Sequence, residues 1–117
     1  MSKKILSDID GYSGSVVIPT RFTAPQYMLW KKTSEALARA KTESGGQYDE
    51  MAASVLPGVI GLVESWEIEG LTSSPTLENF PMTPILSAIR FLLVVWGEIN
   101  EIVMPTVETP NESSPQP

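Results

Sequence analysis

The stretch of sequence that decides the fold is residues 64–104, which read ESWEIEGLTSSPTLENFPMTPILSAIRFLLVVWGEINEIVM. Its first part, residues 65–69, alternates polar and apolar side chains before Gly70. A period of two is typical of a half-buried strand, with Trp66 and Ile68 turned inward and the glutamates in water. The stretch therefore predicts a short strand, followed by a proline-rich loop and then a helix.

The helix at the end of this stretch is the most apolar part of the chain. Thr83 followed by Pro84 is a helix-start signal, and the helical spacing of apolar residues continues to about Val103. Residues 91–96 are all apolar, so here the helix is apolar nearly all round. Such a helix is either central in its domain or half covered by another chain. A domain of this size has difficulty wrapping it completely, which favours a partner.

The rest of the chain supplies a second strand and two further helical segments. Residues 15–19 are rich in β-branched side chains and end at a proline, which predicts a short edge strand. Thr23, with Pro25 and Gln26 behind it, forms a capping-box pattern at the start of a helix over residues 24–42. Residues 49–63 are helical in pattern, but Pro57 and its neighbouring glycines predict a break near Leu56.

The predicted fold is mainly α, a small helical domain with a minor two-stranded β element formed by residues 15–19 and 64–69. Residues 1–14 show no periodicity and are expected to be a flexible lead-in, and residues 15–104 form a single helical domain. Residues 105–117, PTVETPNESSPQP, have the composition of a disordered tail.

The composition excludes several classes of function. The chain has no cysteine and no histidine, so it has no thiolate nucleophile, no disulfide and no Cys/His zinc site. Its net charge of −6 disfavours nucleic acid and anionic membranes. No apolar run approaches the roughly 20 residues of a membrane span, and no secretory signal is evident. We therefore expect a cytoplasmic protein that uses no cofactor and is not an enzyme.

The order of features resembles the small tail assembly chaperones of long-tailed bacteriophages. The resemblance covers about residues 15–104. It is carried by SVVIP at 15–19, FT at 22–23, LPG at 56–58, VESWEIEGL at 63–71, PTLENFP at 75–81 and the helix that begins at Pro84.

This resemblance implies a protein of the host cell cytoplasm that binds the tape measure protein. It would keep that long apolar chain soluble and help recruit subunits of the tail tube. Self-association remains open. In these families a longer product is often made by programmed frameshifting, which only the nucleotide sequence tests.

The candidate partner-binding residues lie in the most apolar part of the last helix. Each could instead belong to the core, whereas Trp30 and Trp66 are expected to be core residues. The candidates are Phe91, Leu93, Val94, Val95 and Trp96.

Three other functions remain as alternatives to chaperoning. The first is a structural connector of the phage particle that acts as a protein–protein adaptor. The second is an enzyme that uses carboxylates alone, with Asp8, Asp10 or the group Glu64, Glu67 and Glu69. The third is an amphipathic protein that lies at a membrane interface.

Overall fold

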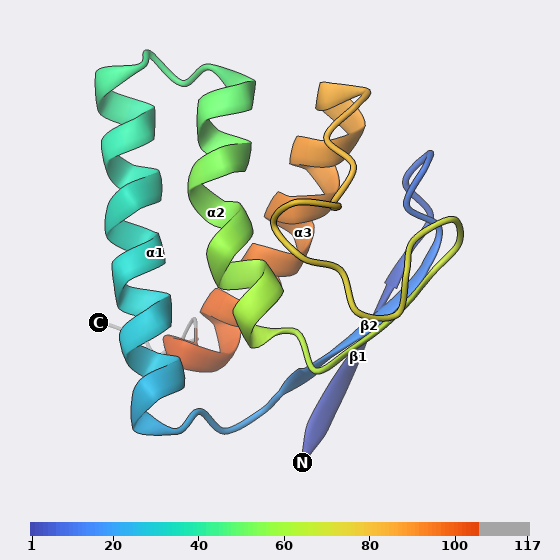
Figure 1. The fold of residues 1–117 in the computed structure, drawn as a ribbon. Helices are drawn as coiled ribbons and strands as arrows, with labels where there is room; N and C mark the ends of the chain where they lie inside the picture. The colour runs from blue at the N-terminus through green and yellow to red at the C-terminus, as the bar shows by residue number, and fades with distance from the viewer. Residues whose placement is uncertain (106–117) are drawn as a thin grey trace, which may run out of the picture.

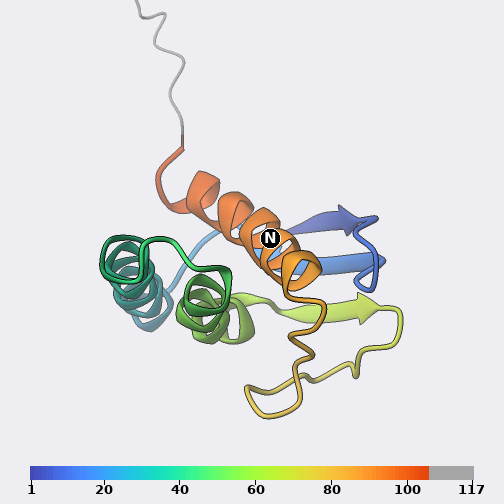
Figure 2. The same cartoon turned by 90° about the horizontal axis from the view of Figure 1, so that it is seen from above.

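The computed structural model describes residues 1–105 as one α+β fold (Figure 1). Its elements are β1 (Ser2–Ser7), β2 (Gly14–Pro19), α1 (Ala24–Glu43), α2 (Tyr48–Leu62), β3 (Ser65–Ile68) and α3 (Ile85–Val103). The strands form one antiparallel sheet in the order β1-β2-β3. Figure 2 shows α3 between the sheet and α2, with α1 on the far side of α2. The prediction of a mainly α domain with two strands is therefore wrong.

The third strand comes from the segment that the sequence presented as a flexible lead-in. β1 pairs with β2 along its whole length, and Ile5 opposite Val16 belongs to the buried core. The neighbouring Leu6 is 75% exposed, so the two adjacent apolar residues conceal the period of two. A third strand also stabilises what would otherwise be an isolated two-stranded ribbon, which is marginal in water.

The loop between β1 and β2 adds a buried aromatic residue to the core. Tyr12 stacks on Phe91 with ring centroids 5.0 Å apart and on Phe80 at 5.8 Å. Its hydroxyl donates a hydrogen bond to the carbonyl of Pro81, so the buried polar atom is satisfied. Trp66 meets Phe80 edge-on at 6.0 Å. This aromatic cluster fixes the loop after β3 against α3.

α1 begins as predicted. The Thr23 hydroxyl accepts from the Gln26 amide, and the Gln26 side chain accepts from the Thr23 amide at 2.8 Å, which completes the capping box. The predicted inward residue Trp30 is buried and donates to the Asn100 side chain at 2.8 Å, linking α1 to α3.

The predicted break in the second helix is wrong, because α2 continues through Pro57 to Leu62. Pro57 lies on the exposed side, so water can reach the Ala53 carbonyl that loses its helical partner. The adjacent Gly58 is buried, and a Cβ there would meet Thr33 of α1 and Trp96 of α3. Packing of this apolar helix outweighs the low intrinsic helix propensity of its glycines and proline.

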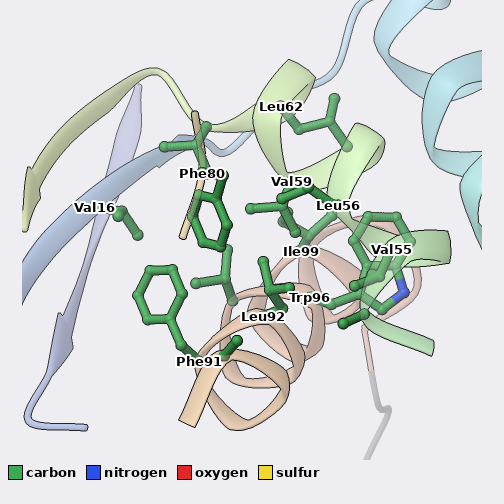
Figure 3. Packing of buried hydrophobic residues seen from close by; sticks show 14 of the residues in the cluster. Val16, Val55, Leu56, Val59, Leu62, Phe80, Phe91, Leu92, Trp96 and Ile99 are labelled. Carbon is green, nitrogen blue, oxygen red and sulfur yellow. The ribbon is translucent and has the colours of Figure 1, made fainter. Parts of the chain in front are cut away.

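The core is centred on α3, which contributes seven buried residues between α2 and the sheet. Figure 3 shows Phe91, Leu92 and Trp96 reaching toward α2 and the strands. The prediction that α3 starts with Thr83 as its N-cap is wrong. Pro84 occupies that position after a cis Thr83–Pro84 bond, and no side chain caps the helix. The turn at residues 76–79, within the predicted loop, is hydrogen-bonded: the Thr76 amide donates to the Asn79 side chain at 2.8 Å.

Candidate protein-binding surface

The structure divides the five predicted partner-binding residues into two groups. Phe91, Val95 and Trp96 are at most 3% exposed, so they are core residues in this fold. Leu93 is 36% exposed and Val94 is 44% exposed. Only these two can touch a partner without unfolding the domain.

The division follows from helix geometry. At about 100° per residue, Phe91, Val95 and Trp96 lie on the arc of α3 that faces α2 and the sheet. Leu93 and Val94 begin the opposite arc. A continuous apolar run has no period of its own, and therefore the sequence could not show which members face inward.

The exposed arc also includes residues that the sequence reasoning did not assign to a site. Leu86 is 49% exposed, Arg90 is exposed, and a Cβ added to Gly97 would meet no atom within 4 Å. We call this surface the α3 outer face. It comprises Leu86, Arg90, Leu93, Val94 and Gly97. The sequence signal that could have found this surface is spacing. Leu93 and Gly97 follow Leu86 by seven and eleven residues, and both spacings return to the same side of a helix.

Polar contacts hold the flanks of this helix in place. The Lys3 ammonium forms an ion pair with the Glu98 carboxylate, which ties β1 to α3. Both side chains are more than a third exposed, so the pair contributes little to stability and serves mainly to position. Asn100 accepts the hydrogen bond from Trp30 on the α1 side. The α3 outer face therefore lies on an element fixed from two directions.

The carboxylates considered for catalysis do not assemble into a metal site. Within residues 1–105 no group of three or more acidic side chains could hold a metal ion. Ser2 donates to Glu64 at 2.9 Å, and Glu67 and Glu69 are exposed at the β3 end of the sheet. These glutamates occupy the solvated positions that the alternating pattern predicted.

A hollow lies beside the loop between α1 and α2. It has a volume of about 740 Å³ and is lined by residues 45–49 together with Met82, Thr83 and Ile85. Asp49 is the charged residue of the lining, and Tyr48 and Thr83 contribute its hydroxyl groups.

Comparisons of the chain with protein-family models, curated proteins and solved structures gave no match. Among the helices of residues 1–105, none has the length and apolar character needed to cross a membrane. The α3 outer face thus stands as an exposed surface, with three large apolar side chains, on a helix whose other side is buried in the core.

Proposed function

We propose that this protein is a tail assembly chaperone of a long-tailed bacteriophage. In the host cell cytoplasm it binds the tape measure protein, keeps that protein soluble and helps recruit tail tube subunits. The observation that carries the proposal is the α3 outer face, where Leu86, Leu93 and Val94 are 36–49% exposed on one rigid helix.

A client helix would pack its own apolar side against these residues, as amphipathic helices do when they bind an apolar surface of a partner protein. Fully burying a large aliphatic side chain is worth about 1.5–3 kcal/mol. Because the three side chains are already more than half buried, covering the rest yields only about 2–4 kcal/mol in total. One such contact is weak, so a long client with many similar helices would be held by several copies acting together.

The charge of the chain supports the same role. A net charge of −6 limits uncontrolled aggregation of an unoccupied chaperone with an apolar surface, because like-charged copies repel at long range, although such repulsion allows a specific weak contact between two copies. Arg90 is the cationic residue on the α3 outer face and offers an ion-pairing point to an acidic client position. The surface therefore combines apolar contact with one orienting charge.

Co-expression with the tape measure protein of the same phage tests the proposal. The client should become soluble and co-purify with the chain. Val94→Glu should abolish co-purification while leaving the circular-dichroism spectrum and melting temperature close to those of the unsubstituted protein. Met28→Glu is the matched control, since Met28 is 58% exposed on α1 and should leave client binding intact.

Three results would contradict the proposal. The first is a client that stays equally insoluble with and without this chain. The second is a Val94→Glu variant that binds the client as well as the Met28→Glu control does. The third is recovery of the chain in purified virions, because an assembly chaperone leaves the finished particle whereas a connector remains in it.

A further inference from the structure

On the α3 outer face the Leu93 side chain projects, and Gly97, which has no side chain, leaves a depression on the same side of the helix. Leu86, Leu93 and Gly97 lie within about 40° of one another around the helix axis. Nothing lies within 4 Å of the position where Gly97 would carry a Cβ. A glycine inside a helix costs about 1 kcal/mol relative to alanine, and no contact within the domain explains that cost.

These positions are symmetric about Val95. Leu93 and Gly97 each lie two residues from it, and Leu86 and Met104 each lie nine residues from it. If two α3 helices pair antiparallel across a two-fold axis at Val95, Leu93 of one copy meets Gly97 of the other. Leu86 then meets Met104, which is 65% exposed just after the helix end.

The charges on this line are also complementary in that arrangement. Arg90 of one copy lies within one residue of the level of Glu101 of the other, and the same contact recurs on the other side of the axis. A two-fold interface requires such self-complementarity, because the same patch serves both copies. A partner of unrelated sequence would not require the apolar residues and the glycine to be arranged symmetrically.

We propose that a second copy of this chain covers the α3 outer face in the free protein, through two-fold antiparallel pairing of the two α3 helices. Figure 2 shows α2 on one side of α3 and the sheet on another, and no element of residues 1–105 lies over the side that faces neither of them, so a second helix has access. One pair of helices buries at most on the order of 1,000 Å², at the low end of specific interfaces. The dimer is therefore weak and exchangeable.

A weak dimer over this face regulates client binding. The second copy shields the apolar residues until a client helix displaces it. Dimer formation and client binding therefore compete for one surface. This displacement step rests on the function proposed above, whereas the pairing of two copies does not. Binding at a shared surface requires that each occupant weakens the other.

Cysteine cross-linking tests the pairing and its register, because the natural chain has no cysteine. A mixture of the Leu93→Cys and Gly97→Cys proteins should form a disulfide-linked dimer under mild oxidation. The mixture of Leu86→Cys and Gly97→Cys, which is out of register by about two helical turns, should give at least tenfold less. Equal yields in the two mixtures, or no cross-linked product in either, overturn the pairing.

Sedimentation equilibrium gives a second measurement on the unmodified chain. The apparent mass should rise with concentration from 12.8 kDa toward twice that value. Leu93→Glu should remain at the monomer mass, and the Met28→Glu control should behave like the unsubstituted protein. A mass of 12.8 kDa at every concentration up to the millimolar range overturns the proposal.

Addition of a tape measure fragment to the in-register mixture tests the displacement. The yield of cross-linked dimer should fall at least fivefold, and an unchanged yield overturns the displacement. Solubilisation of the client by co-expression is measured separately. Failure of the dimer and failure of the proposed function are thus distinguishable.

Discussion

Alanine at Gly58 tests how closely the three helices of this fold approach one another. A Cβ at Gly58 would lie 2.6 Å from Thr33 Cγ2, 2.7 Å from Thr33 Oγ1 and 2.8 Å from Trp96 Cζ3. Thr33 has a stiff β-branched side chain, and Trp96 is a rigid ring that is 3% exposed. Neither can rotate away into solvent, so α1 or α3 must shift.

The magnitude follows from comparison with Gly97, which is also in a helix interior but has open space around it. Gly97→Ala should stabilise the monomer by about 1 kcal/mol through helix propensity alone. Gly58→Ala gains the same propensity but adds overpacking of about 1–3 kcal/mol. The difference between the two variants isolates the packing cost, and three contacts below 3.0 Å place it in the upper half of that range.

Urea unfolding followed by tryptophan fluorescence measures the free energy of unfolding of the Gly58→Ala and Gly97→Ala proteins. The measurement is repeated at several protein concentrations and extrapolated to high dilution, so that association does not contribute. Gly61→Ala is an intermediate control, because its Cβ would meet only the mobile end of Leu29 and should cost little. If Gly58→Ala is as stable as Gly97→Ala, then Gly58 is not at a close helix contact. The explanation given above for the continuity of α2 would then be wrong.

Two further substitutions test the core and its buried hydroxyl. Phe91→Ala should destabilise by about 3–5 kcal/mol, because Phe91 is fully buried in the aromatic cluster. Leu93→Ala, two residues further along α3, should cost only about 1–2 kcal/mol because Leu93 is already 36% exposed, and equal urea midpoints for the two variants would refute the assignment of faces. Burial raises the pKa of the Tyr12 hydroxyl above its ordinary value. The folded state therefore holds the proton more tightly, so stability should be constant up to about pH 10 and fall above it. Tyr12→Phe should remove part of that fall, and an unchanged pH profile of the urea midpoint would contradict it.

Features of the fold that depend on local interactions could be predicted from the sequence. The start of α1 needs only Thr23 and Gln26, three residues apart, and the structure contains both hydrogen bonds of the capping box. The Trp66 and Ile68 alternation likewise predicted β3, because a strand with one wet face carries a visible period.

Features that depend on distant partners could not be predicted in this way. Ile5 is buried because β1 pairs with β2, although its neighbours are lysine and an exposed leucine. Tyr12 sits between glycine and serine in a stretch that resembles a turn, but Phe80 and Phe91 enclose it. The five candidate residues chosen from the sequence lie on both the buried and the exposed side of α3, since an unbroken apolar run does not show which side faces the core.

The α3 outer face follows from how few elements surround α3. α2 covers one side of the helix and the sheet covers another, while α1 packs chiefly on α2. A chain selected for folding alone would place polar residues and an alanine on the remaining side. Leu86, Leu93 and Val94 instead leave about 2–4 kcal/mol of apolar burial unrealised, and Gly97 forgoes about 1 kcal/mol more. Under the two proposals made here, a second copy or a client would recover that free energy. Because both use the same side of α3, substitutions there should alter association and client binding far more than the stability of the monomer.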